Sequence, residues 1–82
     1  MQLQIITPDK TLFDGNAKLI QLPGTNGSFE LMENHAPIIS TLRNGKIKIV
    51  IDNNITEWIH INSGVVEVLK NKVIILAEPS LN

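Results

Sequence analysis

Short runs of isoleucine and valine, separated by turn residues, constrain the fold of this chain more than any other feature. In GKIKIVID, Ile47, Ile49 and Ile51 fall on one side of an extended strand, and two lysines fall on the other. β-Branched residues favour strands, and a strand turns alternate side chains to opposite faces. The pattern therefore predicts a strand with one face in the core.

ITEWIHIN shows the same alternation. Ile55, Ile59 and Ile61 share the expected core face, whereas Trp58 and His60 point away from it. A tryptophan held away from the core needs either a second sheet or a partner protein to cover it, and interface cores favour tryptophan. The residues leave both alternatives open.

Turn residues separate these runs. Asparagine tolerates the positive φ of tight turns, so Asn53-Asn54 and Lys70-Asn71 predict two tight hairpins, and Asn62-Ser63-Gly64 predicts a further turn. VIILA, Val73–Ala77, is apolar at every position, which suits a strand buried on both faces. No window of the sequence has a convincing helical period.

The chain is therefore predicted to form one all-β domain over residues 1–82. Several short strands at regular spacing are typical of a sandwich or a barrel. Strands are expected over Leu3–Thr7, Ala17–Leu22, Ser28–Met32, Gly45–Ile51, Ile55–Ile61, Val65–Leu69 and Val73–Ala77, with weaker ones over Lys10–Phe13 and Ile38–Leu42.

Composition argues against several classes of protein. The formal net charge of −1, with one Trp, two Phe and no Tyr, does not fit the basic face or stacking platform of a nucleic-acid-binding protein. The absence of cysteine rules out disulfides, thiolate chemistry and Cys-ligated zinc. The N-terminus MQLQIITPDK lacks a signal-peptide pattern, and no apolar run has the length of a membrane span. We therefore expect the cytosol, or a surface facing it.

No residue pattern indicates catalysis, a metal or a cofactor. His35 and His60 have neither HxH nor HExxH spacing, and no serine lies in G-x-S-x-G. Gly24 and Gly27 form neither G-x-G-x-x-G nor a P-loop, and predict a turn that needs positive φ. We therefore expect a small binding module in which His35 makes loop or partner contacts and a partner docks at the glycine loop.

Three segments, QIITPDKTLFDG, KLIQLPGTNGSFELMENHAPIISTLRNGKIKIV and HINSGVVEVLKNKVIILAE, resemble a known family in their order and spacing. They resemble the N-terminal domain of the epsilon subunit of the rotary F-type ATP synthase, called delta in mitochondria. The resemblance implies a flattened two-sheet β-sandwich of short, mostly antiparallel strands. It also implies a non-catalytic rotor subunit of the central stalk, with no cofactor, that helps to couple proton or sodium flux to ATP synthesis.

The resemblance further implies two partners, the gamma subunit and the polar loops of the membrane c-ring, and a peripheral place at the cytoplasmic face of the inner (plasma) membrane. Many relatives carry an acidic residue where this chain has Ser28, so Glu30 is a candidate substitute. The implied c-ring residues are Thr25, Asn26, Gly27, Ser28 and Glu30, and the implied gamma residues are Thr7, His35, Ala36, Pro37 and Ser40.

Typical relatives continue into a C-terminal helical hairpin, which in some binds ATP. This sequence stops at Asn82, so we expect the hairpin and its nucleotide site to be absent.

Two other classes remain as alternatives. A lipoyl or biotinyl carrier domain would present a lysine at a hairpin tip, and Lys70-Asn71-Lys72 is a candidate tip without the usual Asp-Lys-Ala or Met-Lys-Met setting. A small oligonucleotide-binding barrel is disfavoured by the net charge and the scarcity of aromatic residues. Neither alternative explains the glycine loop or the His-Ala-Pro segment.

Overall fold

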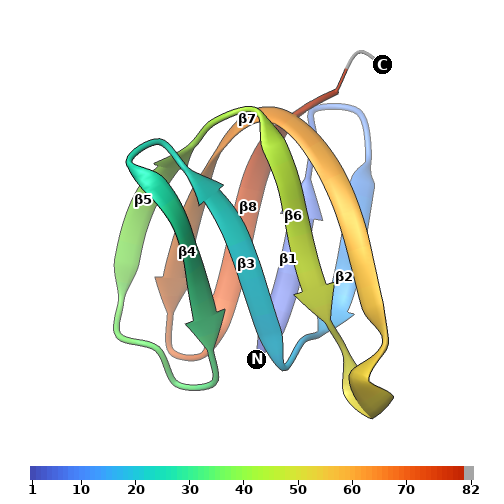
Figure 1. Ribbon diagram of the computed structural model, residues 1–82, viewed down its shortest axis with the longest axis vertical. Helices are drawn as coiled ribbons and strands as arrows, with labels where there is room; N and C mark the ends of the chain where they lie inside the picture. The colour runs from blue at the N-terminus through green and yellow to red at the C-terminus, as the bar shows by residue number, and fades with distance from the viewer. Residues whose placement is uncertain (81–82) are drawn as a thin grey trace.

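The computed structural model describes residues 1–80 and contains, in that range, strands and one short 3-10 helix but no α-helix. Figure 1 shows the strands arranged as two layers, as the alternation of β-branched residues predicts. The elements are β1 (Gln2–Ile6), β2 (Thr11–Asn16), β3 (Leu19–Gly24), β4 (Gly27–Met32), β5 (Ile38–Leu42), β6 (Gly45–Val50), η1 (Asp52–Asn54), β7 (Thr56–Leu69) and β8 (Lys72–Pro79).

One long strand, β7, joins the two layers. Its N-terminal half pairs with β6, and its C-terminal half pairs with β5 and β8, with a register shift between Ile61 and Ser63. One layer has the order β4-β3-β6-β7, and the other has the order β5-β7-β8-β1-β2. Within the described chain, only β1 and β8 run parallel. The predicted sandwich of mostly antiparallel strands is confirmed, and its two sheets are continuous through β7.

The predicted turn at Asn62-Ser63-Gly64 is wrong, because these residues lie inside β7. The chain bends here instead of reversing, and β8 continues alongside, with Gly64 opposite Ala77. A Cβ atom on Gly64 would lie 2.8 Å from the carbonyl oxygen of Leu76, so the lack of a side chain allows this close approach. The turn-forming residues therefore mark the point where one strand crosses from one layer to the other.

Two hairpins contain the asparagines that the sequence singles out. The Lys70-Asn71 turn is confirmed, since its residues have left-handed φ values of 51° and 60° and connect β7 directly to β8. Asn53 and Asn54 also have positive φ, 65° and 58°, but they lie in η1. The loop is longer than the predicted two residues, because the last β6–β7 pair joins Val50 to Thr56.

The core lies between the layers and is apolar, since no buried polar or charged residue occurs among residues 1–80. Close packing of stiff β-branched side chains makes such an interior hard to deform. Both layers contribute to it, and the largest fully buried side chains are Leu3, Ile5, Ile20, Leu22, Leu31, Ile47, Ile49, Ile61, Ile75, Val66 and Val73.

Two sequence interpretations of burial are wrong. Ile55 is 53% exposed, because it follows η1 and precedes the paired part of β7. VIILA is not buried on both faces: Val73 and Ile75 face the core, whereas Leu76 is 57% exposed on the outside of β8. No other layer of the described chain covers that side of β8, so an apolar strand surface remains open.

Candidate functional site

An apolar surface occupies the outside of the layer that contains β5, β7, β8 and β1. Strand pairing places its side chains in rows, because directly paired residues project from the same face. The side chain of Ile39 is 73% exposed, more than any other large hydrophobic residue among residues 1–80. We call this surface the apolar face, and its apolar residues are Ile6, Ile39, Val65, Leu69, Ile74 and Leu76. The same rows also contain polar residues: the exposed Glu67 lies between Ile39 and Ile74, with Gln4 beside Ile74 and Lys72 beside Leu69.

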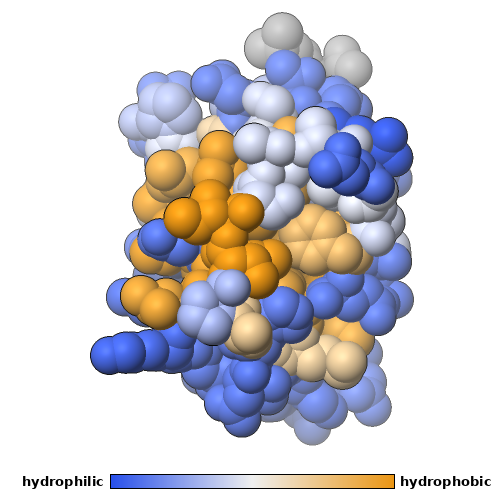
Figure 2. All heavy atoms as spheres, turned by 90° about the vertical axis from the view of Figure 1, so that its left-hand side faces the viewer, coloured by the Kyte–Doolittle hydropathy of each residue, from blue (hydrophilic) through white to orange (hydrophobic). Residues whose placement is uncertain are grey.

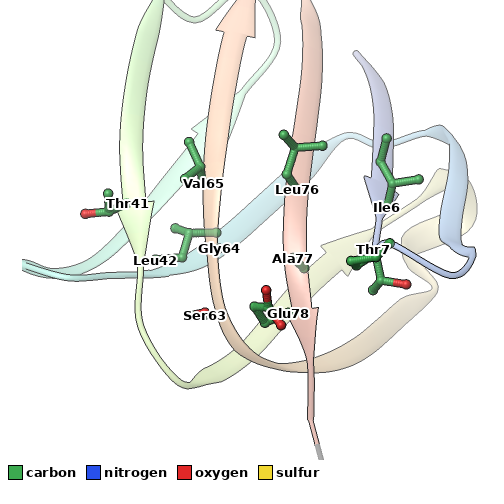
Figure 3. A pocket seen from close by; sticks show the side chains of 11 residues that line it. Ile6, Thr7, Thr41, Leu42, Ser63, Gly64, Val65, Leu76, Ala77 and Glu78 are labelled. Atoms are coloured by element: carbon green, nitrogen blue, oxygen red, sulfur yellow. The ribbon is translucent and has the colours of Figure 1, made fainter.

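A shallow hollow of about 660 Å³ lies at one end of the apolar face. Figure 3 shows Val65, Leu76 and Ile6 side by side on neighbouring strands, with Thr41 at one edge of the row. Thr7 also lines the hollow. The hollow is therefore apolar in its centre and polar at its edges, which is the arrangement of a protein interface.

The residues implied for gamma binding do not form one cluster. Thr7 lines the hollow at one end of the apolar face, whereas Pro37 lines a second hollow, with Ile39 and Leu69, at the other end. Ser40 lies opposite the buried Val66 and so points to the inner side of β5 rather than onto the apolar face.

His35 and Ala36 are exposed in the loop between β4 and β5, and the Nδ1 atom of His35 is 2.7 Å from the Ala36 carbonyl oxygen. Figure 2 views the β4 and β5 side and shows apolar side chains at mid-height with polar residues above and below.

The glycine loop, residues 24–28, lies at the opposite end of the sandwich from the loop that carries His35 (Figure 1). Gly24 pairs with Gly27 across the loop, and a Cβ atom on Gly24 would lie 2.5 Å from the carbonyl oxygen of Gly27. Positive φ is confirmed for Gly27, at 128°, but not for Gly24, where the close approach of the two strands requires glycine. The two positions of the loop thus require glycine for different physical reasons.

Hydrogen bonds attach the glycine loop to the end of β5. The backbone N–H of Thr25 donates to the carbonyl oxygen of Thr41 at 3.1 Å, and its hydroxyl donates to the same oxygen at 2.9 Å. Asn26 and Ser28 are exposed beyond this attachment. Glu30 is also exposed and lies two residues after Ser28 on β4, so both side chains project from the same face.

The outside of the other layer is more polar. Trp58 is 57% exposed, as predicted for a residue on the non-core face, and no second sheet of the described chain covers it. The Nζ atom of Lys48, opposite Trp58 on β6, lies 5.8 Å from the centre of its ring. His60 is on the same face, and its Nε2 atom is 3.2 Å from Oδ1 of Asn44. These contacts are those of a solvated sheet surface.

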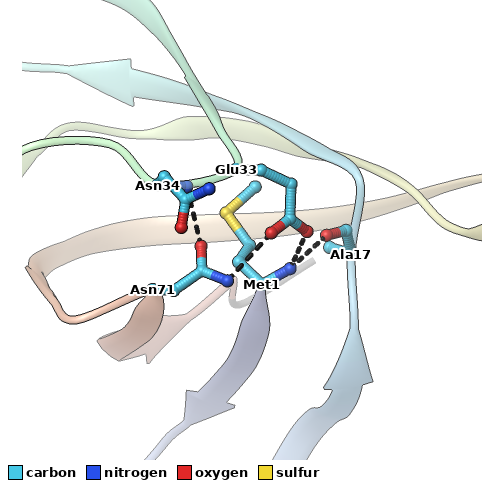
Figure 4. A network of polar contacts seen from close by, with 5 residues as sticks. All are labelled: Met1, Ala17, Glu33, Asn34 and Asn71. Atoms are coloured by element: carbon cyan, nitrogen blue, oxygen red, sulfur yellow. Dashed lines mark hydrogen bonds and ion pairs between the residues drawn. The ribbon is translucent and has the colours of Figure 1, made fainter.

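A polar network that the sequence does not reveal connects the loop between β4 and β5 to the rest of the domain (Figure 4). We call this loop, residues 33–37, the His35 loop. The Met1 ammonium donates to the Ala17 carbonyl oxygen at 3.0 Å and forms an ion pair with Glu33. Asn71 donates from Nδ2 to Glu33 at 2.8 Å and accepts the Asn34 N–H at 2.8 Å. These residues are far apart in sequence, so no local pattern reveals the network.

The network makes stability depend on pH. Hydrogen bonds from the N-terminal ammonium and from Asn71 lower the pKa of Glu33. A carboxylate with a lowered pKa stabilises the fold at neutral pH, and this contribution is lost as the pH falls through that pKa. We expect Glu33→Gln to unfold at lower urea concentration than the wild type at pH 7, with the difference shrinking between about pH 5 and pH 3. Glu57→Gln, at an exposed position on β7, is the control, and a constant difference across that range would contradict the assignment.

No group of three His, Asp or Glu side chains suited to a metal ion occurs in the part of the chain that the structure describes. Across residues 1–80 there is also no helix whose length and apolar character would allow it to cross a membrane.

Comparison with known proteins shows a family match over nearly the whole chain. The beta-sandwich domain of the ATP synthase delta/epsilon chain matches residues 1–81. The ATP synthase epsilon chain of Chlorobium limicola is 35% identical over 77 residues, which cover 94% of this chain and 88% of that protein. The epsilon chain of Caulobacter vibrioides is 36% identical over 78 residues, which cover 95% of this chain and 90% of the relative.

Solved structures share the fold. A chain in the central stalk/c-ring structure of the Tetrahymena thermophila mitochondrial ATP synthase superposes with a TM-score of 0.81 at 18% identity, covering 94% of this chain and 62% of that one. A chain of the Euglena gracilis mitochondrial ATP synthase gives a TM-score of 0.86 at 16% identity, covering 92% and 48%. The family match, the curated relatives and the shared sandwich agree, and this chain belongs to the ATP synthase delta/epsilon chain family.

Proposed function

We propose that this chain is the non-catalytic epsilon-type subunit of the ATP synthase rotor, which connects the gamma subunit to the c-ring in the central stalk. The observation that carries the proposal is the family match over residues 1–81, at 35–36% identity to epsilon chains that this chain covers almost completely. Such a subunit transforms no substrate. It transmits motion between the ion-driven ring and gamma and so helps to couple proton flux to ATP synthesis.

The gamma subunit packs, in this proposal, on the apolar face. A stable contact between proteins buries about 1,600 Å² in total and has an apolar centre with a polar rim. The apolar face supplies that centre with Ile39, Val65 and Leu76, and Thr7 and the His35 loop lie at its two ends. Thr7 and the His35 loop thus form the rim of one surface, whereas Ser40 points to the inner side of β5 and is not part of it.

The c-ring contact lies at the glycine loop. Thr25, Asn26, Gly27 and Ser28 form an exposed polar tip that hydrogen bonds attach to β5. Polar loops of a membrane ring would meet a polar tip without burying apolar surface. Glu30 projects on the same side as Ser28 and is the acidic residue of this proposed contact. The subunit is then peripheral to the membrane, at its cytoplasmic face, through the complex.

A stiff domain is suited to transmitting torque from the c-ring to gamma. β7 belongs to both layers, so a force applied to the apolar face reaches the other layer through one continuous strand. The dense apolar core resists deformation between the layers. Torque received at the glycine loop can therefore pass to gamma without shear inside the domain.

Single cysteines test both contacts, because the chain contains no other cysteine. We expect maleimide to label Ile39→Cys slowly once the gamma subunit is bound, and Asn26→Cys slowly only when the c-ring is also present. Lys46→Cys, exposed on the other outer face, is the matched control and should react equally fast in all states. Unchanged labelling of Ile39→Cys in a stable complex with gamma would place gamma elsewhere.

A further inference from the structure

We infer that Asn71, in the turn between β7 and β8, is a positioning residue that holds the His35 loop in the conformation that binds gamma. The inference rests on the proposed gamma contact. It concerns a residue in a different turn, far from His35 along the chain, which no feature of the His-Ala-Pro segment indicates.

The amide of Asn71 bridges two neighbouring residues of the loop (Figure 4). Its Oδ1 atom accepts the backbone N–H of Asn34 at 2.8 Å, and its Nδ2 atom donates to Oε2 of Glu33 at 2.8 Å. Because both ends of the amide are engaged, its orientation is determined, and a residue with only a donor or only an acceptor could not replace it. The backbone is therefore fixed one residue before His35.

The conformation held by this amide is an unusual one. Asn34 has a φ of 61°, in the left-handed region that few non-glycine residues adopt, although asparagine tolerates it better than most. The hydrogen bond to Asn71 holds the Asn34 N–H in this conformation. The ring of His35 hydrogen-bonds to the carbonyl oxygen of the next residue, Ala36, so its direction follows the loop backbone.

The same turn borders the apolar face. Asn71 follows Leu69 by two residues, and Leu69 lines a hollow together with Pro37 and Ile39. The β7–β8 turn and the His35 loop therefore form one corner of the surface to which gamma is assigned. Asn71 sets the position of one part of this corner relative to the other.

Asn71→Gly tests this role, since glycine keeps the left-handed turn, where φ is 60°, and removes only the amide. We expect Asn71→Gly to weaken binding of the gamma subunit about fivefold to tenfold in the full chain, and by less than about twofold when His35 is already alanine. Asn53→Gly is the matched control, because Asn53 has a φ of 65° in η1, outside this corner, and the change likewise replaces a left-handed asparagine with glycine. We expect Asn53→Gly to bind gamma as tightly as the wild type does.

Amide exchange of the free chain supplies a readout that does not depend on gamma. The Asn34 N–H should exchange faster in Asn71→Gly than in Asn53→Gly, while amides of β6 remain unchanged in Asn71→Gly. If Asn71→Gly weakened gamma binding equally with and without the His35→Ala change, or left exchange at Asn34 unchanged, the positioning role alone would be overturned. Full binding by His35→Ala would overturn the gamma contact of the loop and this inference with it.

Discussion

Replacing Leu76 with glutamate is expected to weaken binding of the gamma subunit by about 100-fold or more while the domain stays folded. Leu76 lies in the apolar centre of the hollow at one end of the apolar face, opposite Val65 on β7 and Ile6 on β1. In the free domain the new carboxylate would face water, so it would cost little stability. In the complex it would be buried in an apolar contact, where an unpaired charge costs several kcal/mol. Titration calorimetry with purified gamma measures the loss.

Ile55→Glu is the matched control for that variant. Ile55 is exposed to nearly the same extent as Leu76, at 53% against 57%, but it lies next to η1, outside the apolar face. We expect its affinity for gamma to equal that of the wild type. Equal affinities of both variants for gamma would show that the exposed apolar residues of β8 are not the contact surface.

Gly24→Ala is expected to lower the free energy of unfolding by about 2–3 kcal/mol and the melting temperature by about 10–20 °C. The added Cβ would lie 2.5 Å from the Gly27 carbonyl oxygen and 2.8 Å from the ring of Phe29. The first of these atoms belongs to the paired backbone, so it cannot move without breaking the β3–β4 register. Urea and thermal unfolding followed by circular dichroism measure the effect.

Gly15→Ala provides the comparison for the same chemical change in another strand. A Cβ atom there would meet only the ring of Phe13 at 3.6 Å, an ordinary van der Waals contact. The free energy of unfolding should change by no more than about 0.5 kcal/mol. If both glycine variants were equally stable, the close approach at Gly24 would not be the reason for glycine in the loop.

Local features of the fold were predictable from the sequence because their causes are local. The alternation in GKIKIVID gave the core face of β6, where Ile47 and Ile49 are fully buried. The Lys70-Asn71 hairpin followed from the tolerance of asparagine for positive φ. The same reasoning failed at Asn62-Ser63-Gly64, because a bend within a strand and a turn between strands use the same residues.

The candidate site was predictable only in part. The glycine loop and the His-Ala-Pro segment stand out as motifs, and both are exposed. The residues of the apolar face do not stand out in the sequence, because Leu76 and Val65 lie in runs of apolar residues and resemble core residues. The link from Asn71 to the His35 loop has no sequence signal, since it depends on two turns meeting at one end of the sandwich.

The amino-acid sequence by itself determined the strand conformation, the tight turns and the family of this chain, because each depends on residues close together or on ordered motifs. Only the tertiary structure decided which apolar side chains remain uncovered. That outcome depends on which strands become neighbours: β7 crosses between layers and brings Val65 beside Leu76. Among residues 1–80, no other layer then covers the outer side of β8 and of the half of β7 that pairs with it. Burial is a property of the assembled sheet, so the exposed surface proposed to bind gamma appears only once the strands are paired.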